Sequence, residues 1–67
     1  MISARNQFEG KVKSVKLGGV MAEVVVSVGQ LELVSAITRT SAEALDLKVG
    51  DAVTAIIKST EVMIGKS

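Results

Sequence analysis

Two short polar clusters lie near the ends of an otherwise apolar chain. The first runs from Ile2 to Gln7 and contains Arg5, and the second runs from Ile57 to Thr60 and contains Lys58. An arginine offers five N–H donors in a planar fork, a lysine offers three, and each Ser or Thr adds one hydroxyl. Neither cluster contains a carboxylate. The clusters therefore favour a bound oxyanion over a metal cation, which would need oxygen ligands.

The composition limits the ways in which so short a chain becomes stable. The 67 residues make one domain at most, and a domain of this size buries only about 60% of its unfolded surface. Cys and His are absent, which excludes disulfides and a zinc site of the usual Cys/His type. Because 48% of the residues are hydrophobic and almost none is aromatic, the aliphatic excess suits a subunit interface. Self-association is the expected source of stability.

The charge and hydropathy of the chain exclude several kinds of partner. A net charge of +1 is too small to attract a polyanion over a distance. No apolar run approaches the roughly 20 residues of a membrane span, and the first residues lack the layout of a signal peptide. The sequence therefore predicts a cytoplasmic protein that binds neither nucleic acid nor a membrane.

Alternating and β-branched segments predict five strands. These are Gly10–Leu17, Val20–Val28, Leu31–Thr38, Ala52–Ile57 and a short fifth strand, Val62–Ile64. Gly18-Gly19 predicts a hairpin turn with positive φ angles. Between the third and fourth strands, Thr40 and Glu43 have the spacing of a capping box and predict a helix of one to two turns.

This order of elements predicts an all-β fold, a five-stranded barrel of the OB type with one short helix. An open ferredoxin-like sheet fits less well, because it would need two longer helices. We find no linker and no internal repeat, so residues 1–67 are expected to form one domain.

Motifs spread over the whole chain resemble those of one family. In order they are Ser3-Ala4-Arg5-Asn6-Gln7, Gly10-Lys11-Val12, Ala36-Ile37-Thr38 with Ser41, Leu47-x-x-Gly50, and Ala55-x-Ile57-Lys58-Ser59-Thr60-x-Val62-Met63. Together they resemble the molbindins, the small "Mop" proteins that bind molybdate and tungstate. Related domains occur in molybdate-dependent transcription regulators and in molybdate-transporter ATPase subunits.

The resemblance implies a homo-hexamer, a trimer of dimers, that binds molybdate or tungstate at subunit interfaces and stores it without catalysis. No organic cofactor and no bare metal cation is implied. The positions that match the family's anion contacts are Ser3, Ala4 through its backbone only, Arg5, Thr38, Lys58 and Ser59. A second kind of site near the threefold axis is also implied, but the resemblance does not place it on particular residues.

The donor-only chemistry of the clusters agrees with this implication. Molybdate and tungstate hold no proton at neutral pH, so every oxygen accepts hydrogen bonds. Phosphate keeps a proton near pH 7, and an all-donor site would leave that proton unpaired at a cost of about 1–3 kcal/mol. Sulfate passes this test, so its exclusion would depend on the size of the cavity.

Simpler interpretations of the same residues remain open. Arg5 at a chain start and Lys58 at a strand end are also typical of solvated surface positions. Thr38 is also typical of a residue that satisfies backbone groups at a strand end. Met21 and Met63 indicate core positions, and the lysines at positions 11, 13 and 16 are typical of edge-strand protection.

Two other functional classes are weighed against oxyanion binding. OB folds that bind single-stranded nucleic acid use aromatic platforms and a positive groove, whereas this chain has only Phe8. An oligonucleotide titration at low salt distinguishes the two. Lys58 and Ser59 together could in principle serve as base and nucleophile, but nothing in the sequence indicates an oxyanion hole. The sequence therefore favours a binding protein over an enzyme.

Overall fold

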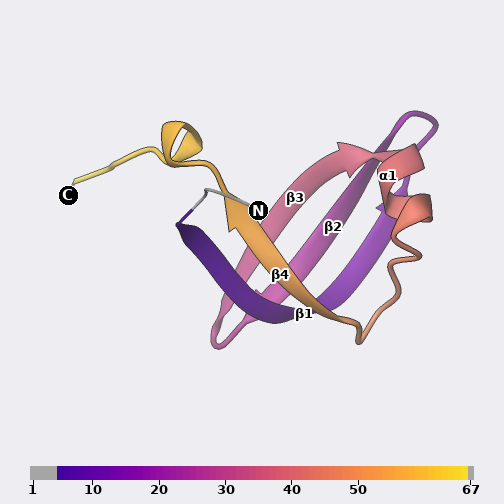
Figure 1. Ribbon diagram of the computed structural model, residues 1–67, viewed down its shortest axis with the longest axis horizontal. Coiled ribbons are helices and arrows are strands. Elements are labelled where there is room, and N and C mark those ends of the chain that lie inside the picture. Colours follow the sequence, from indigo (N-terminus) through magenta and orange to yellow (C-terminus); the bar gives the residue numbers. More distant parts are fainter. Residues whose placement is uncertain (1–4, 67) are drawn as a thin grey trace.

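A four-stranded antiparallel sheet in the order β3-β2-β1-β4 forms the frame of the protein in the computed structural model, which describes residues 5–66 (Figure 1). The strands are β1 (Asn6–Leu17), β2 (Met21–Val28), β3 (Leu31–Thr38) and β4 (Ala52–Ile57). A helix, α1 (Arg39–Ala44), connects β3 to β4, and a 3-10 turn, η1 (Ser59–Glu61), follows β4. The all-β class with one short helix is confirmed.

β1 joins the two halves of the sheet because it pairs with a different strand at each end. Residues 6–11 pair with β4, and residues 11–17 pair with β2. The register shifts between Val12 and Ser14, which leaves Lys13 as an extra residue in a β-bulge. Because a bulge bends its strand and increases its twist, β1 curls, as Figure 1 shows. β1 begins four residues before the predicted start at Gly10.

Gly10 lies where β1 passes closest to β2. A Cβ atom at this position would lie 2.3 Å from the carbonyl oxygen of Ser27, and 2.9 Å and 3.0 Å from methyl groups of Val28 and Val26. Backbone crowding, and not an unusual φ angle, therefore requires glycine here.

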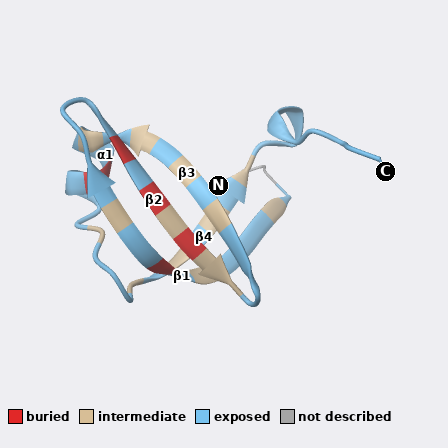
Figure 2. Cartoon of the chain, turned by 180° about the vertical axis from the view of Figure 1, so that it is seen from behind, coloured by how far each residue is buried: buried red, intermediate tan, exposed pale blue. Residues whose placement is uncertain are grey.

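The core is small and lies on one face of the curled sheet. Val12, Val24 and Val26 form its buried centre (Figure 2). Five partly buried side chains pack against it: Val15, Val28, Ile37, Leu47 and Val53. Ala42 is the buried residue of α1. With so few buried residues, the core offers a single chain only limited stability.

The turns lie where the sequence predicts them, but not all of them have the predicted backbone conformation. Gly29, in the β2–β3 turn, has φ of 58°, and Gly50, before β4, has φ of 93°. The predicted positive φ angles at Gly18-Gly19 are wrong, since Gly29 and Gly50 are the glycines with positive φ among residues 5–66. Gly18 is instead required for space, because a Cβ there would lie 2.8 Å from the carbonyl oxygen of Met21.

The helix is capped by a different threonine from the one predicted. Thr38, the last residue of β3, has the extended backbone of an N-cap, and its Oγ1 accepts a hydrogen bond from the amide of Ser41 at 3.1 Å. Thr40 lies inside the first turn, so the predicted Thr40–Glu43 capping box is wrong. The helix can begin here because β3 delivers the chain in an extended conformation directly to the cap.

The predicted fifth strand does not form in the described chain. Residues 62–66 have no regular structure and extend away from the sheet after η1 (Figure 1). A strand needs a neighbouring backbone to satisfy its hydrogen bonds, and here none lies alongside. The Met63 and Ile64 side chains are 93% and 89% exposed. β3 and β4 are the two outer strands, so the sheet is open and the predicted five-stranded barrel is not closed within one chain.

No helix within residues 5–66 combines the length and the apolar character needed to cross a membrane.

Candidate functional site

Arg5 and Lys58 come together at one end of the sheet. The β1–β4 ladder ends with the pair Asn6 and Ile57. One step beyond that pair, on the two antiparallel chains, are Arg5 and Lys58. The register therefore brings the cations of the two sequence clusters to the same strand end, although more than fifty positions separate them along the chain.

These two cations lack a counter-charge within the part of the chain that the structure describes. Both are exposed, and the ion pairs of residues 5–66 are Lys13–Glu32, Arg39–Glu43 and Lys48–Asp46. Within residues 5–66, Arg5 forms no ion pair with Glu9 or Glu61. Lys58 is the N-cap residue of η1 but makes no capping hydrogen bond with its side chain. Two like charges beside each other form a point where an anion would be stabilised.

Ser59 begins η1 and is exposed directly after Lys58. Its position at the same strand end agrees with the sequence prediction of a C-terminal donor pair. Ser3 and Ala4, which the sequence also predicts as contacts, lie outside the described residues.

Thr38 lies at the far end of the sheet from Arg5 and Lys58. It pairs with Met21 at the start of β2, whereas Arg5 precedes the opposite end of β1 (Figure 1). β1 has 12 residues between these two ends, a path of roughly 40 Å along the strand. The structure therefore does not bring Thr38 to the two cations of its own chain.

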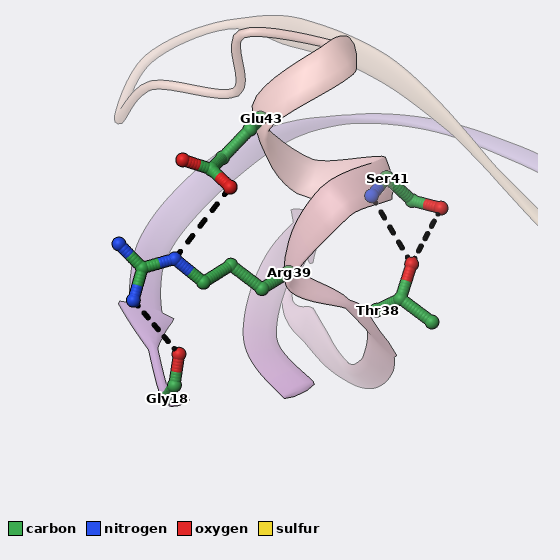
Figure 3. A network of polar contacts seen from close by, with 5 residues as sticks. All are labelled: Gly18, Thr38, Arg39, Ser41 and Glu43. Carbon is green, nitrogen blue, oxygen red and sulfur yellow. Dashed lines mark hydrogen bonds and ion pairs between the residues drawn. The ribbon is translucent and has the colours of Figure 1, made fainter. Parts of the chain in front are cut away.

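Ser41 is a polar residue beside Thr38 that the sequence analysis includes in the family motif but not among the predicted anion contacts. The Thr38 hydroxyl donates to the Ser41 Oγ at 2.8 Å and also accepts from the Ser41 amide (Figure 3). Since Thr38 has used its one hydroxyl proton, the proton still available at this turn belongs to Ser41. The signal that could have identified Ser41 is its position three residues after the strand-end threonine, which places it across the first helical turn.

An apolar groove of about 660 Å³ opens between the two outer strands. Its walls come from the inner face of the sheet and from the segment after α1; they include Val24, Ile37, Leu45, Leu47 and Ile57. The described residues contain no cluster of three or more His, Cys, Asp or Glu side chains that could hold a metal ion. The polar groups that could bind a ligand are therefore the strand-end donors, not a carboxylate cage.

Comparison with known proteins places the chain in a family. A family model described as "TOBE domain" matches residues 2–64. The chain belongs to the TOBE domain family. This TOBE domain is 53% identical over 64 residues to "Molybdenum-pterin-binding protein 3" of Clostridium pasteurianum, and the match covers 94% of each chain.

Solved structures give the same assignment. The TOBE domain superposes on a molybdate-binding protein from Sporomusa ovata with a TM-score of 0.94 and 47% identity, over 98% of both chains. It also matches the cytoplasmic molybdate-binding protein ModG, solved with molybdate bound, with a TM-score of 0.83 and 37% identity. That match covers 88% of this chain and 43% of ModG. The resemblance to the Mop proteins is therefore confirmed.

Proposed function

We propose that this TOBE domain binds molybdate, and tungstate in the same way, as an oxyanion between subunits of a homo-oligomer. The observation that carries the proposal is the convergence of Arg5 and Lys58, two cations without a counter-charge among the described residues, at one strand end. Relatives along nearly the whole chain are described as molybdate-binding or molybdenum-pterin-binding proteins. Ser3, the Ala4 backbone and Ser59 are proposed to supply further donors beside the two cations.

A site between subunits follows from where the donors lie. Thr38 and Ser41 are at the opposite end of the sheet from Arg5 and Lys58. One anion cannot contact both sets of donors within a single chain, but it can do so when the Thr38 end of one subunit meets the Arg5 end of another. We therefore assign Arg5 and Lys58 to one subunit at each site, and Thr38 with Ser41 to its neighbour.

The surface of the isolated chain supports self-association. A compact 7.0 kDa monomer should expose about 4000 Å², whereas this chain exposes 5598 Å². Much of the excess is apolar and includes Leu31, Val34, Met63 and Ile64. We propose that a second subunit covers the apolar groove and gives residues 62–64 a strand partner. The five-stranded barrel would then be complete only in the assembly, with the trimer of dimers as the proposed arrangement.

The proposed biological role is storage of the oxyanion in the cytoplasm. Residues 1–67 would act as one binding module without catalysis and without an organic cofactor, and a relative of the same fold is described as cytoplasmic. The name of another relative includes a pterin. A separate experiment therefore tests the expectation that this protein holds no organic cofactor. Protein purified without added ligand should show no pterin fluorescence after denaturation.

Native mass spectrometry tests the assembly and the ligand together. At micromolar concentration we expect a hexamer, because the monomer exposes too much aliphatic surface to remain alone. Added molybdate should increase the mass of the hexamer in whole steps of one anion. A folded monomer with no molybdate adduct would contradict both the assembly and the sites between subunits.

Selectivity tests the donor-only character of the site. Molybdate stays a dianion from pH 6 to 9, so its affinity should be nearly constant over that range, and tungstate should compete with it almost one for one. Phosphate carries an extra proton at pH 6 that finds no acceptor, and it should fail to displace molybdate even at large excess. The measurement is competition calorimetry in a phosphate-free buffer. Displacement by equimolar phosphate at pH 6 would indicate a general phosphate-binding protein.

A further inference from the structure

Arg39 connects the first turn of α1 to the β1–β2 hairpin through two contacts and makes a third contact within the helix. Its Nη1 donates to the carbonyl oxygen of Gly18 at 3.1 Å, and its Nε lies 3.5 Å from Oε1 of Glu43 (Figure 3). Its backbone amide donates to the carbonyl oxygen of Val20 at 2.8 Å. We call these contacts the Arg39 clamp.

Apart from the β2–β3 ladder, which holds Thr38, few contacts fix the position of this turn. α1 has six residues and only Ala42 is buried in the core. An isolated helix of this length is not stable in water, so its position depends on the contacts it makes. The turn carries Thr38 and Ser41, the two hydroxyl residues that the proposed function assigns to the anion. The clamp is therefore placed to control where these hydroxyls lie.

The guanidinium group acts at a distance from those hydroxyls. Figure 3 shows the Arg39 side chain and the Thr38–Ser41 pair on opposite sides of the turn. Arg39 binds Gly18 and Glu43 on its own side. Any effect on the anion must then pass through the position of the backbone at residues 38–41, and not through a direct contact.

We propose that Arg39 is a positioning residue for oxyanion binding. By fastening the start of α1 to the β1–β2 hairpin, it holds the Ser41 hydroxyl, which Thr38 contacts, in the place where it meets the anion bound by Arg5 and Lys58 of the neighbouring subunit. This inference rests on the proposed function. Glu43 supports the clamp from within α1, because its carboxylate lies beside the guanidinium that donates to Gly18.

A pure charge effect and a positioning effect predict opposite changes in molybdate affinity for the Glu43→Ala variant. Arg39→Ala removes a positive charge and Glu43→Ala removes a negative one. If only charge mattered, Glu43→Ala would strengthen binding of a dianion. The clamp requires both variants to weaken molybdate binding in calorimetry, Arg39→Ala by about fivefold to tenfold and Glu43→Ala by less, because the contact with Gly18 remains. Lys13→Ala and Glu32→Ala are the matched controls, because that exposed pair lies away from the α1 turn and should leave the affinity unchanged.

Coupling to Ser41 separates positioning from a general loss of structure. In a Ser41→Ala background, Arg39→Ala should have little further effect on affinity, since the hydroxyl that it positions is gone. A lysine at position 39 can reach Gly18 or Glu43 but cannot contact both as the guanidinium does. Arg39→Lys should therefore bind molybdate more tightly than Arg39→Ala does, but less tightly than the wild type. Thermal unfolding and native mass spectra of each variant report whether the fold and the assembly are intact.

The outcomes are distinct. Parallel weakening by Arg39→Ala and Glu43→Ala, absent in the Ser41→Ala background, supports the clamp. The clamp is overturned if the two variants change the affinity in opposite directions, if neither changes it, or if the effects of Arg39→Ala and Ser41→Ala are fully additive. In each of these cases, molybdate binding by the wild type still upholds the proposed function. A wild-type protein that does not bind molybdate overturns the proposed function and this inference together.

Discussion

Replacing Arg5 and Lys58 together by alanine should abolish molybdate binding at micromolar protein concentration. In the proposed site each cation makes charge-assisted hydrogen bonds to the same dianion, so each single variant should lose about 1.5–3 kcal/mol of binding free energy. Calorimetry measures the loss. Lys16→Ala removes the same charge from an exposed position that pairs with Glu23 in the sheet, and it should bind as the wild type does. Equal losses in all three single variants would mean that overall charge governs binding.

Mixed oligomers test whether each site uses two subunits. One variant lacks Arg5 and Lys58, and the other lacks the hydroxyls of Thr38 and Ser41. When the two are unfolded and refolded together, roughly a quarter of the sites should combine one intact half from each variant and regain wild-type affinity. Two separately refolded samples, combined afterwards without exchange, provide the control. No recovery in true mixed oligomers would place the whole site within one subunit.

Gly10→Ala should lower the free energy of unfolding by about 2–3 kcal/mol, as overpacking of a tight site does. The added Cβ would lie 2.3 Å from the Ser27 carbonyl oxygen, which is backbone and cannot rotate away as a side chain would. β1 and β2 would have to separate where they enclose the core. Thermal or denaturant unfolding of the oligomer at fixed subunit concentration measures the change, because dilution alone also alters apparent stability.

Gly19→Ala is the matched control for Gly10→Ala. A Cβ at Gly19 would meet no atom within 4 Å, and its φ angle is not positive. Its unfolding free energy should differ little from that of the wild type. If both glycine variants were equally destabilised, the contact with Ser27 would not explain the loss.

The sequence predicted β3 and β4 in full and β2 to within one residue. The β4 and β3 bounds agree with their apolar and β-branched runs. Two errors have physical causes. Residues 6–9 begin with Asn and Gln, which have weak strand preference, and it is their pairing with β4 that makes them part of β1. Residues 62–64 have the composition of a strand, but composition cannot provide a partner.

The candidate site was predictable as chemistry but not as geometry. The residue types alone indicate donors for an oxyanion, and the β1–β4 ladder places Arg5 and Lys58 at the same strand end. That placement depends on the β1–β4 register, a long-range property that no local pattern encodes. The separation of Thr38 from this pair depends on the β2–β3 register and on the length of β1. The sequence also could not show that the Thr38 hydroxyl donates to Ser41, which leaves the Ser41 proton available. That conclusion needs the positions of the two side chains.

The pairing of β1 with β4 also has a consequence for how the chain folds. β1, β2 and β3 follow one another through short turns, so their contacts are local and should form early. Arg5 and Lys58 meet only after the longest loop in the molecule has closed, and closing that loop carries the largest entropy cost. We expect the two cations to be brought together last. A chain still emerging from the ribosome would then hold a folded meander long before it could capture an anion.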